Sequence, residues 1–339
     1  MSKRKSRIHL ATTSSTISAL RGQPLPSSVR YQEGTFQNSR GQELFFLAAL
    51  PADAKGRECV RAVVLFLHAL GDHCRRYSFL YERLCERGFG VIAYDFVSHG
   101  ASESCVHGVR AHTTRFHHFV DDTNDFVTFA TSTLLPSMMP GPAAAVSPPI
   151  VLGAYSYDTL VGMHTVLSRQ HHFAAMCFIG PSLFIRLTPL LRLQAAFAGP
   201  LSTLFPKAHI VPAVNREWLC RDPGYFEDFD NDPLTTDTRK VTTRMGSETL
   251  RAMRALAIDS QVAQPDSAFS QTPALFLIGS ADRVVCQRQA TRFFDRLASR
   301  DKEVKVFPGL YHCLLEDPEK EDVVRHLMQW LEQRFPNTL

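Results

Sequence analysis

The sequence lacks several features that would assign a protein to a class at once. None of its segments has eighteen uncharged apolar residues, the length that a helix needs to span a bilayer. Its eight cysteines contain no Cys-x-x-Cys pair, which argues against a zinc site or a disulfide framework and favours a reducing compartment. A formal net charge of +4 is too small to indicate nucleic acid as a partner. We predict no metal and no cofactor, and the oligomeric state stays open.

Acidic residues are missing from residues 1–32, which hold six lysines and arginines and many serines and threonines. Because an apolar core segment is also missing, this stretch is not a secretory signal. Its composition is compatible with an organellar transit peptide, but it shows no clear amphipathic helix. We therefore expect a disordered basic tail at 1–32, a folded domain at 33–339, and a cytoplasmic protein, with organellar targeting left open.

Apolar runs alternate with helical spacings along most of the remaining chain. With 339 residues, of which 45% are hydrophobic, the chain can hold one α/β domain with an inserted cap or two average domains. The run at 60–68 is typical of a parallel strand buried on both faces. This rhythm predicts an α/β fold with a mostly parallel, doubly wound sheet. Further strands are expected at 35–36, 44–50, 90–94, 149–153, 174–180, 273–278 and 304–307, and helices at 77–87, 116–134, 160–167 and 321–334.

The alternation stops at about 181–270, where short amphipathic pieces, prolines and polar stretches replace it. This stretch is interpreted as a mainly helical cap inserted into a single domain. Residues 159–216 hold five basic residues and no acidic residue, and 183–205 is rich in Leu, Phe and Pro. Such a cap could lie on an anionic bilayer interface. A cap that only covers a pocket is an equal alternative.

Three residues that could form a catalytic triad follow predicted strands. Ser156 comes after the apolar run 149–153, Asp282 after 273–278, and His312 after the last strand. Open α/β sheets place their sites at these carboxyl ends. A serine hydroxyl needs an imidazole to take its proton, and a carboxylate to orient that imidazole. The chain order Ser, Asp, His is that of α/β-hydrolases, so we predict Ser156 as the nucleophile.

An oxyanion hole is expected beside the nucleophile. The segment 68–71 (HALG) follows the strand at 60–68, where α/β-hydrolases supply one backbone N–H, here that of Leu70. The second N–H would come from Tyr157, the residue after the nucleophile. The usual Gly-x-Ser-x-Gly pattern around such a serine lacks both glycines in this chain, because Ala154 and Asp158 stand in their places.

Several segments together resemble the monoacylglycerol lipase branch of the serine α/β-hydrolases, also described as serine aminopeptidase-like. The segment 68–77 (HALGDHCRRY) is similar to the family's HGxGEHSxRY, and 95–102 (DFVSHGAS) to its D-x-x-GHGxS. The remaining similarity lies in 231–234 (NDPL), 279–283 (GSADR), 311–312 and the closing helix with Trp330. The resemblance covers nearly all of the expected folded chain.

This resemblance implies hydrolysis of monoacylglycerols through an acyl-enzyme on Ser156, with release of fatty acid and glycerol. It also implies that Asp72 and Arg76 hold the glycerol end of the substrate, where the family usually has Glu and Arg. The family's cap is a membrane-touching lid, so the implied partners are a lipid ester and a membrane surface. A solvated start of a helix is the alternative for Asp72 and Arg76.

The departures from the family pattern leave a second class of function open. Ala69 and Ala154 replace glycines and add one methyl group each, whereas Asp158 brings a carboxylate close to the nucleophile, and Thr159 also stands where glycine is common. A carboxylate that points into the pocket would disfavour an oxyanion. The alternatives are a hydrolase-like lipid-binding protein with little or no turnover, or a lysophospholipase, thioesterase or general carboxylesterase.

Overall fold

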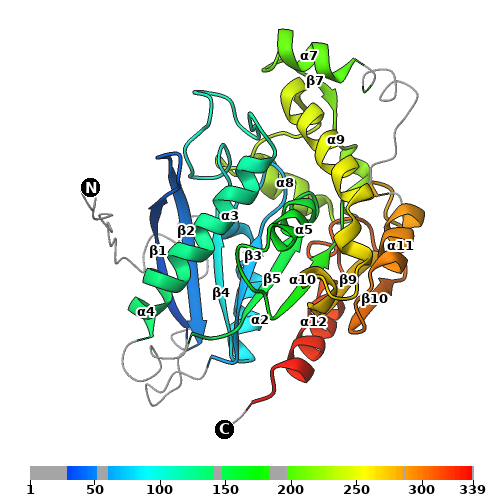
Figure 1. Ribbon diagram of the computed structural model, residues 1–339. Coiled ribbons are helices and arrows are strands. Elements are labelled where there is room, and N and C mark those ends of the chain that lie inside the picture. The colour runs from blue at the N-terminus through cyan, green and yellow to red at the C-terminus, as the bar shows by residue number, and fades with distance from the viewer. Residues whose placement is uncertain are drawn as a thin grey trace.

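The computed structural model describes residues 29–51, 60–139, 147–183, 195, 197–285 and 287–337. Within these ranges, eight strands form one twisted sheet at the centre of the molecule (Figure 1). β1 and β2 run antiparallel to their neighbours, and the other strands run parallel. In spatial order they are β1 (Val29–Gln37), β2 (Glu43–Pro51), β4 (Phe89–Tyr94), β3 (Ala62–Leu67), β5 (Ile150–Tyr155), β6 (Ala175–Ile179), β9 (Ala274–Gly279) and β10 (Lys302–Phe307).

The central strands are the apolar runs that the sequence indicates. Every residue of β3, β4, β5, β6 and β9 is buried, as expected for parallel strands covered on both faces. The predicted mostly parallel sheet is therefore confirmed. β1 begins at Val29, before the expected start at residue 33, and the rest of the predicted basic tail lies outside the described residues.

Helices cover both faces of the sheet (Figure 1). One face packs against α3, α5, α9 and α11, and the other packs against α2 and α12. A π-helical turn at Ala130–Leu134 joins α3 to α4, and a 3₁₀ turn at Cys74–Tyr77 precedes α2. The bounds are α2 (Ser78–Glu86), α3 (His117–Phe129), α4 (Leu135–Met138), α5 (Asp158–Ser168), α10 (Ala268–Gln271), α11 (Gln287–Arg296) and α12 (Lys320–Arg334).

Between β6 and β9 the chain leaves the sheet and builds a separate group of elements above its carboxyl edge (Figure 1). We call residues 195 and 197–263 of this stretch the cap. β7 and β8 pair antiparallel, and α7 packs against α9. The elements are α7 (Ala198–Leu204), β7 (His209–Pro212), a 3₁₀ turn (Arg216–Trp218), α8 (Pro223–Asn231), β8 (Lys240–Thr242), α9 (Thr243–Ile258) and a second 3₁₀ turn (Ser260–Ala263).

Candidate active site

The predicted nucleophile lies at a sharp turn between β5 and α5. Ser156 has a φ of +52°, in the left-handed region that residues other than glycine seldom occupy. The turn is held by hydrogen bonds on both sides. The Ser156 N–H donates to the Ile179 carbonyl at 2.8 Å, and the Ser156 carbonyl accepts from the Thr159 hydroxyl at 2.7 Å. Backbone strain of this kind is typical of functional sites, and here it lifts the serine side chain above the sheet edge.

The structure brings the three predicted triad residues into one hydrogen-bonded chain. The Ser156 Oγ lies 2.7 Å from the His312 Nε2, and the His312 Nδ1 lies 2.8 Å from the Asp282 Oδ2. The three side chains come from the loops after β5, β9 and β10. His312 and Asp282 are buried and Ser156 is partly exposed. This is the arrangement in which an imidazole removes the proton of a serine hydroxyl.

Asp282 is held in the ionised form that such a triad requires. Burial alone would raise its pKa, but the adjacent His312 and the backbone N–H groups of Val284 and Val285 outweigh burial and lower the pKa. These N–H groups donate to the Asp282 Oδ1 at 2.8 and 3.1 Å. The Oδ2 is thus left to accept the His312 Nδ1–H, and the Nε2 faces the Ser156 hydroxyl.

Two glycines let the histidine loop approach the sheet closely. A Cβ on Gly279 would lie 2.3 Å from the carbonyl oxygens of Leu310 and Tyr311, and a Cβ on Gly180 would lie 2.9 Å from the His312 carbonyl oxygen. Gly180 also has a φ of +57°. The sequence alone offered no signal for Gly180, since its role depends on a contact with the distant residue 312.

The predicted oxyanion loop follows β3 and lies beside the nucleophile. Leu70 and Tyr157 line the same pocket as Ser156. The backbone N–H groups of Leu70 and Tyr157 donate no hydrogen bond to any residue that the structure describes. Both N–H groups are therefore available to a substrate oxygen. The buried His68 fixes the loop, because its Nε2 accepts the Phe96 N–H at 3.1 Å and its Nδ1 lies 2.8 Å from the Ala69 carbonyl oxygen. Burial lowers the pKa of His68, which keeps the ring neutral.

Asp158 does not point into the pocket. It is the first residue of α5, is 2% exposed, and is absent from the residues that line the pocket around Ser156. Its Oδ2 lies 3.7 Å from the His68 Nδ1, behind the oxyanion loop, and has no hydrogen-bond partner among the described residues. Burial and then the charge of Asp72 raise the pKa of Asp158 well above its ordinary value. The environment therefore favours the neutral, protonated form of the Asp158 carboxyl group.

The structure pairs Asp72 and Arg76 with each other. The Arg76 Nε lies 2.9 Å from the Asp72 Oδ1, and both side chains are buried. Arg76 also lies 2.9 Å from Asp228 of α8 and 3.4 Å from Asp232 just after it. Asp72 lines the pocket and accepts the Tyr77 hydroxyl at 3.0 Å, whereas Arg76 is not among the lining residues. Because both side chains are buried, neither belongs to a solvated start of a helix. Arg76 links Asp72, which follows the oxyanion loop, to Asp228 of α8.

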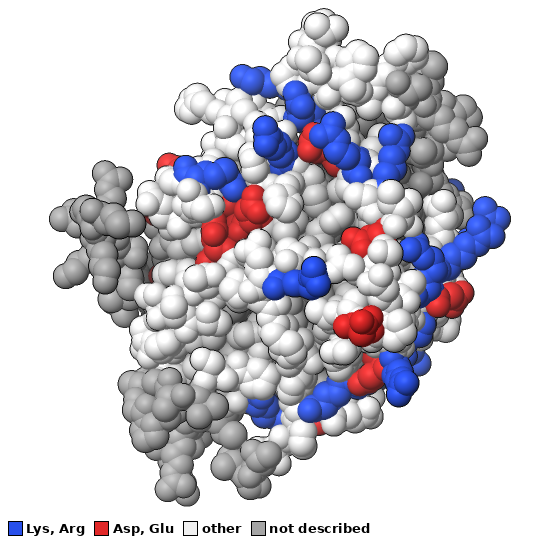
Figure 2. Space-filling model, in the orientation of Figure 1, with Lys and Arg blue, Asp and Glu red and all other residues white. Residues whose placement is uncertain are grey.

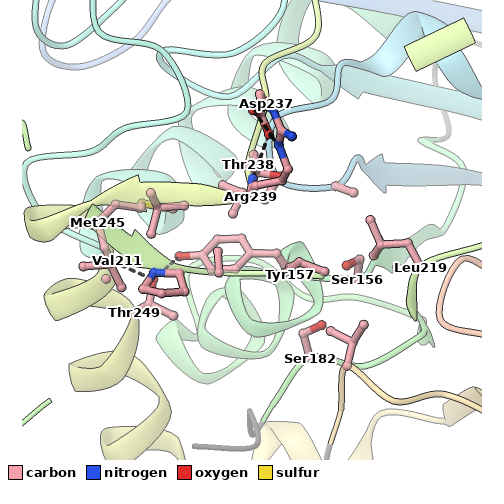
Figure 3. A pocket seen from close by; sticks show the side chains of 18 of the residues that line it. Ser156, Tyr157, Ser182, Val211, Leu219, Asp237, Thr238, Arg239, Met245 and Thr249 are labelled. Atoms are coloured by element: carbon pink, nitrogen blue, oxygen red, sulfur yellow. Dashed lines mark hydrogen bonds and ion pairs between the residues drawn. The ribbon is translucent and has the colours of Figure 1, made fainter. Parts of the chain in front are cut away.

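An apolar pocket opens between the nucleophile and the cap. Its lining is mostly aliphatic and aromatic, with cap residues of β7, α8 and α9 opposite Ser156. Figure 3 shows the Tyr157 ring crossing the pocket towards Thr249 of α9, and their hydroxyl oxygens are 3.0 Å apart. The ion pair of Asp237 and Arg239, 2.7 Å between Oδ2 and Nη2, lies at another part of the wall (Figure 3). The lining offers mostly apolar surface, with the Ser156 hydroxyl at its base.

Other kinds of site are not evident in the described residues. Among them, no group of three His, Cys, Asp or Glu side chains is arranged to hold a metal ion. The helices that the structure describes include none with the length and apolarity needed to cross a membrane. The cysteines that it describes are free thiols.

Comparisons with known proteins agree with this geometry. The family described as serine aminopeptidase, S33, matches residues 58–319. Human monoglyceride lipase is 27% identical over 312 residues, which cover 91% of this chain and 93% of the human protein. An abhydrolase domain-containing protein of Dictyostelium discoideum is 24% identical over 277 residues, which are 81% of this chain but 27% of that longer protein.

A solved structure supports the fold. A soluble variant of monoglyceride lipase from Saccharomyces cerevisiae, in complex with a substrate analogue, has a TM-score of 0.73 at 18% identity, with 92% of this chain and 96% of that chain covered. The family match spans most of the sequence and includes all three triad residues. The chain therefore belongs to the serine aminopeptidase (S33) family and is a monoacylglycerol lipase-like α/β-hydrolase.

Proposed function

We propose that the protein is a serine ester hydrolase that cleaves monoacylglycerols or similar single-chain lipid esters. The observation that carries this proposal is the hydrogen-bonded chain of Ser156, His312 and Asp282 at the base of an apolar pocket. The likeness to human monoglyceride lipase over 91% of the chain supports the substrate class. The elbow forms around Ser156 although its two glycines are missing, which favours an active enzyme over a binding protein.

The first half of the reaction transfers the acyl group to Ser156. The Ser156 Oγ attacks the ester carbonyl carbon while the His312 Nε2 takes the hydroxyl proton. The negative charge that develops on the carbonyl oxygen is stabilised by the N–H groups of Leu70 and Tyr157. When the tetrahedral intermediate collapses, the ester C–O bond breaks and His312 returns the proton to the departing glycerol oxygen.

The second half releases the fatty acid. Water attacks the acyl-enzyme, and the His312 Nε2 takes one of its protons. The bond between the acyl carbon and the Ser156 Oγ then breaks, and the proton returns to that oxygen. Asp282 stabilises the imidazolium ion formed in each half, because its Oδ2 accepts the Nδ1–H at 2.8 Å.

We place the two ends of the substrate against different walls of the pocket. The acyl chain would lie among the apolar side chains of β7, α8 and α9. The glycerol end would lie near Asp72, a residue of the pocket lining whose carboxylate can accept hydrogen bonds from hydroxyl groups. Arg76 would act on this end through Asp72, at 2.9 Å, rather than by contact with the substrate.

Contact of the cap with a membrane surface is part of the same proposal. Leu204 and Phe205 at the end of α7 are 70% and 59% exposed, and Phe197 and Ile210 on either side of them are 56% and 47% exposed. Large apolar side chains grouped in this way fit the acyl boundary of a bilayer. Lipid substrate could then enter the pocket without crossing water. Residence in the cytoplasm stays a prediction.

Hydrolysis of a chain-length series tests the proposal. Purified protein is given monoacylglycerols and p-nitrophenyl esters of increasing acyl length, and fatty acid release is measured. We expect turnover that depends on Ser156 and is lost in Ser156→Ala. The matched control is Ser182→Ala, because Ser182 lines the same pocket but forms no hydrogen bond with His312. Turnover of none of these esters by the wild type would overturn the proposal.

A further inference from the structure

A second cavity lies at the junction between the cap and the main domain, away from Ser156. Two of its walls come from the loop before α3 and from the segment between α7 and β7, and the third comes from the start of α9. Its lining carries four basic groups: His112 and Arg115 from the loop, Lys207 from the α7–β7 segment, and Arg244 from α9. The described lining residues include no acidic side chain. Figure 2 shows Lys and Arg side chains gathered over this upper part of the molecule.

The cations of this cavity lack counter-ions in the described part of the chain. Arg115, Lys207 and Arg244 form no ion pair or side-chain hydrogen bond with any residue that the structure describes. Glu248, one turn along α9 from Arg244, is engaged elsewhere: it lies 3.1 Å from Arg251 and accepts the Phe116 N–H at 3.1 Å. Positive charge is thus concentrated at a concave surface where the described residues supply no paired negative charge.

His112 adds a buried polar group to the same cavity. It is 1% exposed, and its Nδ1 lies 2.7 Å from the Thr242 Oγ1. Burial, followed by the charges of His209, Arg244 and Lys207, lowers the pKa of His112 to about 4. The ring is therefore neutral at pH 7, and an anion placed among these cations would raise its pKa.

The start of α9 is not itself the source of the anion affinity. The Thr243 and Arg244 N–H groups donate to the Ala208 and Pro206 carbonyls at 3.0 and 3.2 Å. The Met245 N–H donates to the Thr242 Oγ1 at 3.1 Å. The first backbone donors of α9 are thus already satisfied, and the side chains are what remains for a ligand.

From this arrangement we propose that the cavity binds a phosphate group that bridges the cap and the main domain. Three cations facing one cavity match the two negative charges and the several acceptor oxygens of a phosphate, and arginine pairs with phosphate oxygens through two parallel bonds. The same phosphate chemistry has two sources, a lipid headgroup or a free phosphate ester. The exposed Leu204 and Phe205 directly precede Pro206 and Lys207 of the cavity wall, which favours the headgroup.

A thermal unfolding titration tests phosphate binding. The Ser156→Ala protein is titrated with inorganic phosphate and with glycerol 3-phosphate, against sodium chloride of equal ionic strength. Because this variant carries out no acyl transfer from Ser156, binding is measured whether or not the protein is a lipase. We expect a saturable rise in Tm of about 2 °C at a tenfold excess over Kd. Absence of a saturable rise beyond that of chloride would overturn the proposal.

Matched charge variants locate the site. Lys207→Gln and Arg244→Gln should each weaken phosphate binding by about tenfold or more. Lys240→Gln is the control, since Lys240 is an exposed cap lysine outside both cavities and its loss changes net charge equally. The Tm of each variant without phosphate checks its fold. Equal phosphate affinity in all three variants would overturn the assignment to this cavity.

Vesicles distinguish the two sources. We expect vesicles that contain phosphatidic acid, whose headgroup is a phosphate monoester, to sediment the wild type more than phosphatidylcholine vesicles do. Arg244→Gln should lose that preference, and Lys240→Gln should keep it. Phosphate binding that depends on Arg244, together with vesicle binding that does not, would assign the cavity to a soluble phosphate ester and exclude the headgroup.

Discussion

Asp158→Asn tests how a carboxyl group is accommodated next to the nucleophile. The substitution keeps the shape of the side chain and removes its titration. In the folded protein, burial and the charge of Asp72 raise the pKa of Asp158 well above the value of 3.8 that applies to the unfolded chain. As the pH rises above 3.8, the unfolded chain loses this proton while the folded protein keeps it. The free energy of unfolding of the wild type therefore falls with rising pH until the folded group ionises.

The expected size follows from that linkage. Within this window each pH unit removes up to about 1.4 kcal/mol from the wild type through Asp158. Asp158→Asn has no titrating carboxyl group at this position and loses this dependence. The variant should therefore be more stable than the wild type at neutral pH, by a margin that grows with pH.

Urea unfolding at several pH values between 5 and 8 measures the difference. Turnover of a p-nitrophenyl ester by the same samples should stay within about twofold of the wild type, because the Asp158 side chain lies outside the pocket lining. Asp158→Gly should likewise preserve or raise kcat. Parallel stability curves, or a variant less stable than the wild type, would show that Asp158 is ionised and paired with a protonated His68, and would refute the reasoning.

Other substitutions probe the triad, the oxyanion loop and the cap. Asp282→Asn should lower kcat by about 10⁴-fold, since His312 loses the acceptor that fixes its tautomer; a loss below tenfold would contradict this role. Arg76→Met should lower the stability measured by urea unfolding by about 3–5 kcal/mol, because Asp72 is left buried without its partner; an unchanged midpoint would count against the ion pair. Phe205→Glu should weaken vesicle binding about tenfold while hydrolysis of a water-soluble ester is unchanged; equal loss of both would indicate misfolding.

The sequence predicts the central sheet and the triad together, for one physical reason. Strands buried on both faces need continuous apolar runs, so the predicted strand at 60–68 matches β3 (Ala62–Leu67) closely. The carboxyl ends of parallel strands meet at one edge, and Ser156, Asp282 and His312 all follow such ends. Chain order and strand position were therefore enough to predict that Ser156 and His312, which are 156 positions apart in the sequence, lie close together.

Other elements give weaker signals. α11 (Gln287–Arg296) was not predicted, because only Ala290 and Phe293 of its residues are buried and the rest of the segment is mostly polar. The start of β1 was placed too late because its first six residues are only half-buried and show no alternation. Both elements lie at the edges of the core, where burial leaves little trace in the sequence.

The roles of Asp158 and Arg76 depend on contacts between distant segments. The spacing of Asp72 and Arg76 suits a pair one turn apart, but the approach of Asp228 and Asp232 to Arg76 follows from how α8 folds over the loop. The direction of the Asp158 side chain is likewise set by the His68 loop, which arrives from β3. Neither contact can be predicted from the residues next to Arg76 or Asp158 in the sequence.

Labelling with a fluorophosphonate probe tests most directly that Ser156 is an activated nucleophile. Such a probe forms a covalent bond with a serine only when a neighbouring base removes the hydroxyl proton. We expect stoichiometric labelling of the wild type and of Ser182→Ala, and no labelling of Ser156→Ala. His312→Ala should also fail to react, because it lacks the base found at 2.7 Å from the Ser156 Oγ. An unlabelled wild type, or labelling that persists without Ser156, would contradict the account.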